Sequence, residues 1–303
     1  MDISQEGLRT LAAVLREGTF DAAATALHIT PSAVSQRIKA LESAAGRVLL
    51  RRTKPATATP DGEVLVRLAK QWELLLAETR AEFVGAPDDD DLPLVERPRV
   101  HLPVATNADS LATWLLPVLA RFHREHAVAV EVFRDDETRS STLLRTGDVL
   151  AAVTSEPLAI RGCALQSLGT MRYLPVATPE FIDTWLPDGP DADALARAPM
   201  VQFDRNDHIQ RNISAALAGR PVDPPAVYIP ASTEYHRAVA LGIGWGAVPV
   251  VQIADALDTG RVRLIADHHI DVPLYWQHWK LSSPLLQTLT TSVVDGAARV
   301  LQH

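Results

Sequence analysis

A segment near the N-terminus carries hydroxyl, amide and cationic side chains at helical spacing. The sequence from Phe20 to Glu42, FDAAATALHITPSAVSQRIKALE, predicts two short helices separated by a turn. Pro31 suits the first turn of the second helix, because its missing N–H would be unpaired there anyway, and Thr30 can cap that helix. The apolar side chains expected to face inward are Val34, Ile38 and Leu41. The polar face that remains fits a helix in the major groove of DNA, where Arg and Gln read base edges. The residues expected to face DNA are Thr30, Pro31, Ser32, Ser35, Gln36, Arg37 and Lys39.

A basic segment follows this predicted helix pair. Residues 48–50 are apolar and predict a short strand, and residues 55–60 alternate Thr and Ala between two prolines, which suggests a two-stranded wing. Arg51, Arg52 and Lys54 would lie on that wing and contact phosphates, which adds affinity without sequence information. Two other interpretations stay open at this point. The helix pair could be an ordinary hairpin with a solvated face, and the basic segment could be a solvated loop.

Polar side chains also gather where predicted strands of the C-terminal part end and helices begin. Hydroxyl groups and free N–H groups at helix starts suit a carboxylate, and carboxylates suit ammonium or guanidinium groups. Together they describe a site for a zwitterion with an additional positive charge. The alternative is that each residue only caps a helix, as Ser, Thr and Asp commonly do. The residues of this candidate site are Asn107, Asp109, Ser110, Thr154, Asp204, Ser232, Thr233 and Glu234.

The sequence contains no convergent set of catalytic residues or metal ligands. Cys163 has no neighbours that would activate a thiolate, and His123 and His126 lack a nearby cysteine or carboxylate that would complete a metal site. The glycines of residues 242–246 do not have the spacing of a dinucleotide-binding fingerprint. We therefore expect no enzyme activity, no metal and no cofactor.

Composition indicates a folded protein of two or three domains. The chain has 303 residues, of which 47% are apolar, and its single cysteine excludes an intrachain disulfide. The first residues lack the basic and apolar regions of a secretory signal, so we expect a cytoplasmic protein. Residues 238–257 are largely apolar, but their glycines, proline and polar residues predict a buried helix–turn–strand rather than a membrane span.

The net charge of −8 is unevenly distributed. Residues 1–60 hold eight Lys and Arg against five Asp and Glu, whereas the remainder holds 21 against 32. The net charge is therefore +3 for residues 1–60 and −11 for the remainder, which add to −8. Because phosphate contacts are made locally, a small basic head on an acidic body is compatible with DNA binding.

Periodicity and composition divide the chain into four parts. Residues 1–62 form the predicted DNA-binding head. Residues 63–84 predict a long helix whose apolar stripe is too long for the head to bury, so we expect it to pair with a second copy. Residues 85–98 hold four successive Asp and three Pro, which is typical of a linker. Residues 99–303 alternate strands and helices, which predicts an α/β domain with largely parallel strands.

The elements expected in this last part are short. The predicted strands cover residues 100–105, 128–133, 149–153, 173–177, 200–203, 227–229 and 246–250. The predicted helices cover residues 111–123, 140–145, 209–217, 234–241, 251–257 and 284–301.

The chain resembles the LysR-type transcriptional regulators over essentially its whole length. The residues that carry the resemblance are Phe20–Ala24, Leu27, Ser32–Ser35, Ile38, Leu41–Glu42, Leu50–Arg52 and Thr59–Gly62. One departure is Pro31-Ser32, where most of the family has Gln-Pro, and it bears on the base contacts of this helix. The segments similar to the ArgP/LysG subgroup, which senses basic amino acids, are Ser32–Glu42, Leu49–Thr53, Asn107–Phe122 and Asp136–Arg139.

The resemblance implies an α+β multidomain fold. It implies an N-terminal winged helix-turn-helix, a long dimerising linker helix and a two-lobed α/β effector domain like that of periplasmic binding proteins. The expected first lobe covers residues 99–170 and 246–303, and the expected second lobe covers residues 171–245.

The resemblance also implies lysine or arginine as the effector and the gene for a basic amino-acid exporter as a target. Its implied partners are promoter DNA, a second copy in a dimer or tetramer, and RNA polymerase. The alternatives are a LysR-type regulator of another small ligand and a solute-binding module that does not bind DNA.

Overall fold

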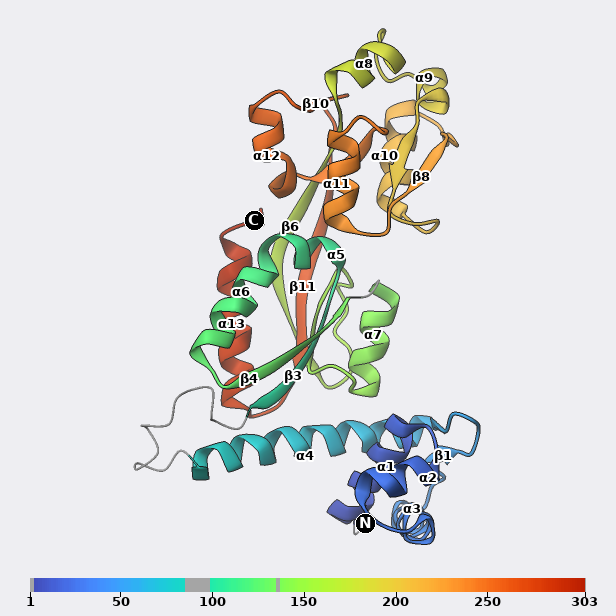
Figure 1. The fold of residues 1–303 in the computed structure, drawn as a ribbon, viewed down its shortest axis with the longest axis vertical. Coiled ribbons are helices and arrows are strands. Elements are labelled where there is room, and N and C mark those ends of the chain that lie inside the picture. Colours follow the sequence, from blue (N-terminus) through green and yellow to red (C-terminus); the bar gives the residue numbers. More distant parts are fainter. Residues whose placement is uncertain (1–2, 85–98, 135–136, 303) are drawn as a thin grey trace.

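The computed structural model describes residues 3–84, 99–134 and 137–302. Its N-terminal head contains three helices, α1 (Gln5–Glu17), α2 (Phe20–Leu27) and α3 (Pro31–Ala45), and an antiparallel wing of β1 (Leu50–Arg51) and β2 (Thr57–Ala58). The long helix α4 (Pro60–Val84) leads away from the head and lies beneath the C-terminal domain (Figure 1). The predicted linker 85–98 and Asp136 lie outside the described residues.

Local sequence signals define the helices of the head. The side chains of Ser4, Thr19 and Thr30 each accept a backbone N–H at the start of a helix. Gly18 and Gly46 end α1 and α3 in the left-handed conformation, which favours glycine. The inward positions predicted for α3 are confirmed as buried, and they are Val34, Ile38 and Leu41.

The start of α4 differs from the prediction. The long helix was predicted from residue 63, but it begins at Pro60, where the Thr59 hydroxyl accepts the N–H of Gly62 at 3.0 Å. A Cβ on Gly62 would come within 2.0 Å of the Leu49 carbonyl oxygen, so glycine lets the helix approach the wing. The first wing strand also begins later than predicted, since Val48 is 66% exposed and lies outside it.

Helix α4 presents three faces with different surroundings. One face contributes Leu65, Val66 and Ala69 to the hydrophobic core of the head. Another contributes Leu74 to the core of the C-terminal domain, where it is 5% exposed. The third face is apolar but exposed in this chain, and its residues are Val64, Leu68, Trp72 and Phe83. This exposed face agrees with the expectation that α4 pairs with a second copy.

The C-terminal domain is built on a mixed sheet with the strand order β10-β6-β11-β5-β3-β4, and β9 pairs with β6. Its strands are β3 (Val100–Thr106), β4 (Val128–Arg134), β5 (Ala151–Thr154), β6 (Cys163–Ala177), β9 (Gly246–Pro249), β10 (Arg263–Leu264) and β11 (Ile270–Trp279). Only the β3–β4 and β3–β5 pairs of this sheet are parallel.

The prediction of a largely parallel sheet is therefore wrong. Strand β11 was not predicted, and β6 begins ten residues before the predicted start at 173. These two long strands pair antiparallel along most of their length. The β11 sequence holds a proline and polar residues, which weaken the strand signal, and the ladder to β6 supplies the pairing that local sequence does not indicate.

Helices cover the sheet on both sides. The predicted helix 111–123 is interrupted, since it consists of α5 (Ala108–Ser110), a π-helical turn η1 (Leu111–Leu115) and α6 (Leu116–Glu125). Helices α8 (Pro179–Trp185) and α9 (Ala192–Arg197) were not predicted. The others lie within a few residues of their predicted positions: α7 (Glu137–Thr146), α10 (His208–Ala218), α11 (Ser232–Ala240), α12 (Val250–Asp258) and α13 (Pro284–Ala298).

The elements far from α4 form a second packing unit around a small parallel sheet of β7 (Met200–Gln202) and β8 (Ala226–Tyr228). A hydrophobic cluster joins Val201 and Tyr235 to Val248, Ile253 and other residues up to 262. Strand β9 and α12 therefore pack with elements of the 171–245 part, and Figure 1 shows β10 beside them. The predicted domain and lobe boundaries stay predictions.

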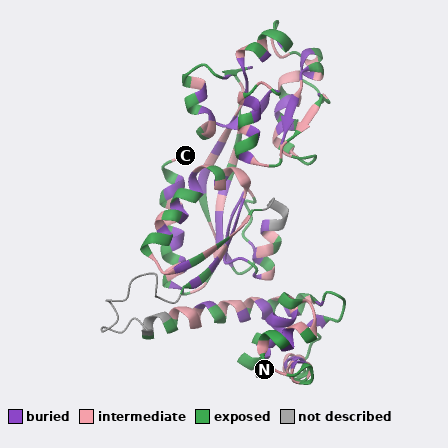
Figure 2. Ribbon diagram, in the orientation of Figure 1, coloured by how far each residue is buried: buried purple, intermediate pink, exposed green. Residues whose placement is uncertain are grey.

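Burial follows these packing units. Buried residues line the sheet and the inner faces of its helices, whereas the outer helix faces are exposed (Figure 2). None of the helices in the described ranges has the length and apolar character needed to cross a lipid bilayer.

Candidate DNA-binding face and effector site

The outer face of α3 and the wing carry the residues predicted to contact DNA. Along α3, Pro31, Ser32, Gln36 and Lys39 are exposed, and Ser35 and Arg37 are half-buried. The Thr30 hydroxyl caps α3 by accepting the N–H of Ala33 at 3.2 Å. On and beside the wing, Arg51, Arg52 and Lys54 are exposed.

Two of the cationic side chains have partners within the head. Arg37 forms an ion pair with Glu6 of α1, with 3.2 Å between its guanidinium and the carboxylate. The Arg52 guanidinium lies over the Phe20 ring, 5.2 Å from its centroid. These contacts hold both cations against the head, whereas the described contacts leave Arg51 and Lys54 without a partner of this kind.

Asp109, at the start of the helical segment that follows β3, connects the two packing units of the C-terminal domain. Its carboxylate accepts hydrogen bonds from the Tyr173 hydroxyl at 2.6 Å and from the Ser232 hydroxyl at 2.5 Å. The Ser232 oxygen in turn accepts the Gln252 side-chain amide at 2.7 Å. A chain of hydrogen bonds thus runs from β6 through Asp109 to α11 and α12. We call Tyr173, Asp109, Ser232 and Gln252 the junction network.

Two further predicted residues lie beside Asp109 at the edge where β3 ends. The Asn107 side chain accepts the Ser110 N–H at 2.8 Å and so caps α5. The Ser110 hydroxyl is buried and has no hydrogen-bond partner among the described residues. An unpaired buried hydroxyl is costly, which makes Ser110 a candidate donor to a ligand.

Thr154 lies at the same edge of the sheet, because β3 and β5 are parallel and pair Ala105 with Ala152. It is buried, and its hydroxyl accepts the Gln277 side-chain amide at 3.2 Å. Asp204, Thr233 and Glu234 are exposed. The Asp204 carboxylate accepts the N–H of Asn206 at 2.6 Å, and none of the described contacts joins Thr233 or Glu234 to Asp109. The structure thus brings together only part of the predicted effector site.

Asp207 is an acidic residue that the sequence analysis missed. Its carboxylate accepts the N–H groups of Phe203 and Gln210 and caps α10. Burial raises the pKa of this carboxyl, the backbone hydrogen bonds lower it, and the charges of Asp204 and Asp109 raise it further. The electrostatic effect of Asp109 on Asp207 indicates that the carboxylates share one region of negative potential. The position of Asp207 before a helix was the available signal.

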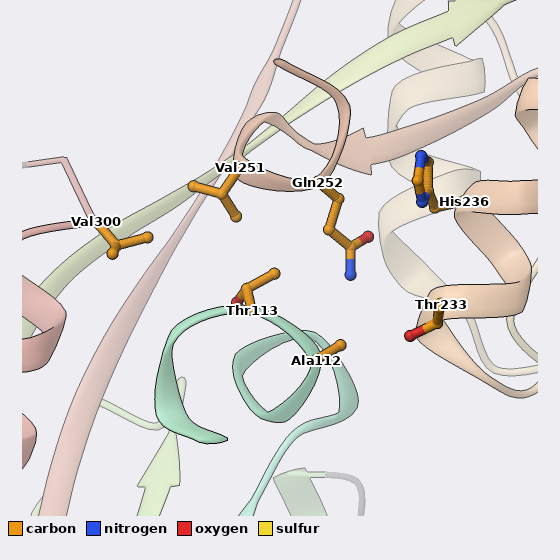
Figure 3. A pocket seen from close by; sticks show the side chains of 7 residues that line it. All are labelled: Ala112, Thr113, Thr233, His236, Val251, Gln252 and Val300. Carbon is orange, nitrogen blue, oxygen red and sulfur yellow. The ribbon is translucent and has the colours of Figure 1, made fainter. Parts of the chain in front are cut away.

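A pocket of about 430 Å³ opens beside Gln252 of the junction network (Figure 3). It is lined by Ala112, Thr113, Thr233, His236, Val251, Gln252 and Val300. The pKa of His236 is lowered, chiefly by burial and also by the charge of Arg261. Gln252 belongs both to this pocket and to the junction network, so the two adjoin.

No catalytic or metal-binding arrangement is found in the part of the chain that the structure describes. Burial raises the pKa of the Cys163 thiol to about 11, although the nearby cations Arg67 and Lys280 lower it slightly, so the sulfur is protonated at neutral pH. Among these residues, His, Cys, Asp and Glu side chains form no cluster of three that could hold a metal ion.

Two family models match the chain. The model of bacterial regulatory helix-turn-helix proteins of the lysR family covers residues 6–63, and that of the LysR substrate binding domain covers residues 96–298. The chain belongs to the LysR family of transcriptional regulators. The predicted resemblance and fold class are therefore confirmed.

Named relatives of this LysR-family protein are similar to it over nearly the full length. The lysine export transcriptional regulatory protein LysG of Corynebacterium efficiens is 44% identical over 96% of each chain. The crystal structure of ArgP from Mycobacterium tuberculosis is 40% identical, with a TM-score of 0.89 over 100% of this chain and 99% of that one.

Two structures of full-length LysG from Corynebacterium glutamicum are 38% identical to this LysR-family protein. The structure with bound effector Arg covers 99% of this chain and 100% of that one, with a TM-score of 0.83. The other covers 100% of both chains, with a TM-score of 0.61. The arrangement of this chain is thus more similar to the structure that contains arginine.

Proposed function

We propose that this LysR-family protein is a DNA-binding transcriptional regulator that responds to lysine or arginine. The observation that carries the proposal is the acidic junction around Asp109, in a chain that is 38% identical to LysG with bound Arg. A basic amino acid offers one carboxylate and two cationic groups. The junction offers carboxylates for the cations and hydroxyl and N–H groups for the carboxylate.

Asp109 is the first residue that we assign to the effector. Its carboxylate is bound here by two neutral hydroxyl donors, Tyr173 and Ser232, and by no cation among the described residues. An ammonium or guanidinium group would form a stronger, charge-assisted hydrogen bond with the same oxygens. Asp204 and Asp207 add negative potential, and the unpaired Ser110 hydroxyl is available for the effector carboxylate. Asn107, Thr154 and Ser232 support this site, and Thr233 and Glu234 lie at its margin.

In the head, the exposed side chains of α3 would read base edges and the wing would contact phosphates. Ser32, Ser35, Gln36 and Lys39 are assigned to the major groove, with Thr30 and Pro31 at the helix start. Arg37 is paired with Glu6, and its remaining N–H donors are assigned to DNA. Arg51, Arg52 and Lys54 are assigned to the backbone, where cations give affinity that falls with salt.

Pairing of the exposed α4 face with a second copy would place two heads on two half-sites, one helical turn of DNA or a multiple apart. The gene for a basic amino-acid exporter is the target that the named relatives suggest, since LysG is described as a regulator of lysine export. A regulator of promoters works where the DNA is, so the cytoplasm is the compartment that we propose, and RNA polymerase is the partner that we propose at the promoter. A coupling free energy of about 1–3 kcal/mol between effector and DNA is typical of such systems.

Calorimetric titration of the full-length protein with arginine, lysine and a neutral amino acid such as leucine tests the effector. Heat of binding from arginine or lysine, and none from leucine, is the expected result. Equal heats from all three, or none from any, would remove the basic amino acid and leave the alternative of a LysR-family regulator of another ligand.

DNA binding by the head is tested by titrating the protein into DNA fragments from its own gene neighbourhood. An unrelated DNA fragment of equal length is the control. A shift of a promoter fragment at lower protein concentration than the control is expected. If no fragment is preferred, the alternative of a solute-binding module without a DNA function gains support.

A further inference from the structure

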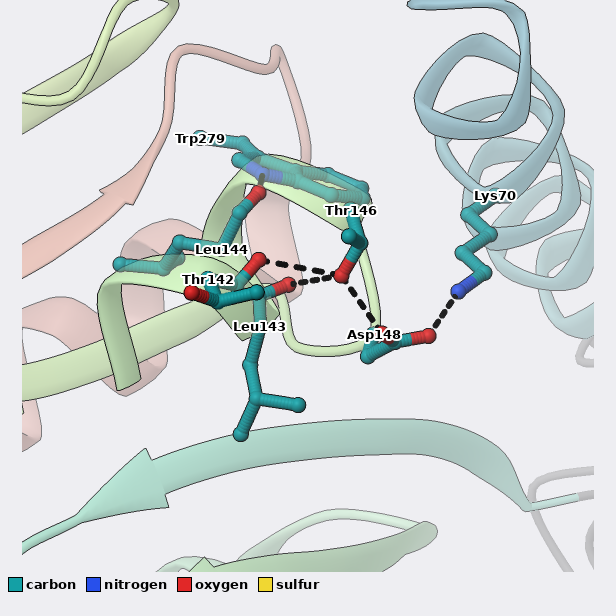
Figure 4. A network of polar contacts seen from close by, with 7 residues as sticks. All are labelled: Lys70, Thr142, Leu143, Leu144, Thr146, Asp148 and Trp279. Atoms are coloured by element: carbon teal, nitrogen blue, oxygen red, sulfur yellow. Dashed lines mark hydrogen bonds and ion pairs between the residues drawn. The ribbon is translucent and has the colours of Figure 1, made fainter. Parts of the chain in front are cut away.

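Helix α4 is bound to the C-terminal domain of its own chain by polar contacts one helical turn apart. The Lys70 ammonium forms an ion pair with Asp148 at 2.6 Å, and the Arg67 guanidinium donates to the backbone carbonyl of Arg145 at 2.9 Å. Residues 145–148 comprise the end of α7 and the start of the loop that leads to β5, next to α4 (Figure 4). This loop is therefore the first docking point of α4.

A second docking point lies about two turns further along the same face. The Glu78 carboxylate accepts the Ser283 hydroxyl at 2.5 Å and the Leu285 N–H at 3.2 Å, at the start of α13. Between the two points, Leu74 is 5% exposed in the core of the C-terminal domain. Arg67, Lys70, Leu74 and Glu78 are spaced three or four residues apart, so they occupy one side of the helix. We call these four residues the docking face.

The loop under the docking face is closely packed. The Thr146 hydroxyl donates to the second oxygen of Asp148 at 2.5 Å, which orients the carboxylate toward Lys70. Gly147 has a φ of +76°, and a Cβ there would lie 2.9 Å from the Trp279 ring and 3.1 Å from Cγ of Arg67. Glycine thus lets the loop fit between α4 and Trp279.

Two strands connect this docking point to the effector site. Strand β5 begins three residues after Asp148 and ends at Thr154, whose hydroxyl accepts the Gln277 amide. Strand β11 carries Gln277 and ends at Trp279, whose indole N–H donates to the Leu144 carbonyl at 3.3 Å. A displacement of β5 or β11 caused by a ligand at the junction would therefore reach the loop that holds Lys70.

We propose that the docking face of α4 is a releasable clamp, and that the effector changes its occupancy and thereby the angle between head and C-terminal domain. The clamp itself stands on the contacts above, whereas its response to an effector rests on the proposed function. The ion-paired side chains of Lys70 and Asp148 are 27% and 45% exposed, and ion pairs with such exposure are weak enough to open and close.

Two further observations support a clamp that opens. The structures of LysG from Corynebacterium glutamicum match this chain with TM-scores of 0.83 and 0.61 at the same identity, so the parts of that protein are arranged in two ways. The exposed apolar face of α4, with Leu68 and Trp72, is distinct from the docking face, so pairing with a second copy leaves the clamp accessible to change.

Charge reversal tests the clamp in the full-length protein. The variants are Lys70→Asp, Asp148→Lys and the double exchange, with Arg80→Asp on α4 and Asp188→Lys in the C-terminal domain as controls of equal charge change. Arg80 and Asp188 are exposed, and neither has a described partner. Hydrogen–deuterium exchange is measured without effector in the segments 143–150 and 283–287, which contain the two docking points. Faster exchange in these segments indicates an open clamp. Each single reversal should raise exchange there several-fold, the double exchange should restore protection, and the controls should match the wild type.

The response to an effector is measured as the ratio of DNA affinities with and without arginine. We expect each single reversal to change this ratio at least threefold and the double exchange to return it to the wild-type value. Unchanged exchange in the single variants overturns the clamp. If hydrogen–deuterium exchange changes but the ratio of DNA affinities with and without arginine does not, the clamp exists and its regulatory role is overturned. If calorimetry shows that arginine does not bind, the proposed function fails, and exchange without effector still decides whether the clamp exists.

Discussion

The carboxylate of Asp109 and the hydroxyl of Ser232 are 2.5 Å apart, although 123 residues separate them in the chain. Ser232 starts α11 in the second packing unit, and Asp109 follows β3 in the first, so this hydrogen bond links the two units. A ligand that bound the Asp109 oxygens in place of Ser232 would break this link. We therefore expect ligand binding and the relative position of the units to be coupled through Asp109.

Replacing Asp109 with Asn should weaken binding of arginine and lysine about tenfold or more, because a hydrogen bond to a charged group contributes about 1.5–3 kcal/mol. Ser232→Ala removes only a neutral donor and should weaken binding much less. Calorimetric titration measures both, with Asp188→Asn as the control. Equal loss of affinity in the Asp109 and Ser232 variants would argue against a charge interaction.

Gln36→Ala and Arg51→Ala should separate the two kinds of DNA contact. Loss of the Gln36 amide should reduce discrimination between promoter and mutated promoter by about 1–3 kcal/mol, whereas loss of the Arg51 cation should weaken all sequences alike and flatten the salt dependence. Fluorescence anisotropy at several salt concentrations distinguishes them. A uniform effect of both substitutions would show that α3 does not read bases.

Gly147→Ala should lower the free energy of unfolding more than Gly162→Ala does. Both glycines have positive φ, which costs about 1–2 kcal/mol for an L-residue, but only Gly147 has neighbours within reach of an added Cβ. Overpacking against Trp279 and Arg67 should add about 1–3 kcal/mol. Urea unfolding of the two variants measures the difference, and equal destabilisation would mean that the loop is not tightly held.

Leu68→Glu and Trp72→Glu should weaken self-association without unfolding the chain. Leu68 is 39% exposed and Trp72 is 45% exposed, so neither substitution removes a core side chain in the single chain, whereas both would bury a charge in a paired helix. Sedimentation velocity should show a smaller species than for the wild type and for the control Arg80→Glu. A wild-type sedimentation coefficient in both variants would exclude pairing through this face.

His236 should make the stability of the protein fall in mild acid. Burial first, and then Arg261, lowers its pKa below the ordinary value of 6.5. The folded state therefore binds the proton more weakly than the unfolded state, and stability that is complete above pH 6.5 is lost as the pH falls through the folded-state pKa. His236→Gln should show a smaller loss of the free energy of unfolding between pH 7.5 and 5 than the wild type or His268→Gln, as urea titrations at each pH would measure.

The helix pair and the wing of the head could be predicted from the sequence because their signals are local. Thr30, Pro31 and the inward residues of α3 lie within one helix, and their spacing determines both cap and face. The sheet of the C-terminal domain depends on pairing between distant strands. Pro273 weakens the strand signal within the largely apolar β11 sequence, and β6 at 163–177 supplies its partner ladder.

The junction network was predicted only in part for the same reason. Asp109 and Ser232 could be identified as polar residues at helix starts, but their contact depends on how the two packing units meet. Tyr173 and Gln252 join the network from β6 and α12 and carried no signal of their own. Thr233 and Glu234 follow Ser232 in sequence, yet a helix turns successive residues to different sides. Thr233 therefore lines the adjoining pocket and Glu234 is exposed, and none of the described contacts joins either to Asp109.

Because different faces of α4 pack on the head and on the C-terminal domain, the number of residues in α4 determines how the two are oriented. Residue 69 belongs to the core of the head and residue 74 to the core of the C-terminal domain, and the segment between them sets their rotational phase. One inserted residue would rotate the C-terminal domain by about 100° around the helix axis relative to the head, whereas seven inserted residues would nearly restore the phase and lengthen the spacing by about 10 Å. The number of residues in this segment is therefore constrained by the required rotation between the two domains, whichever side chains occupy it.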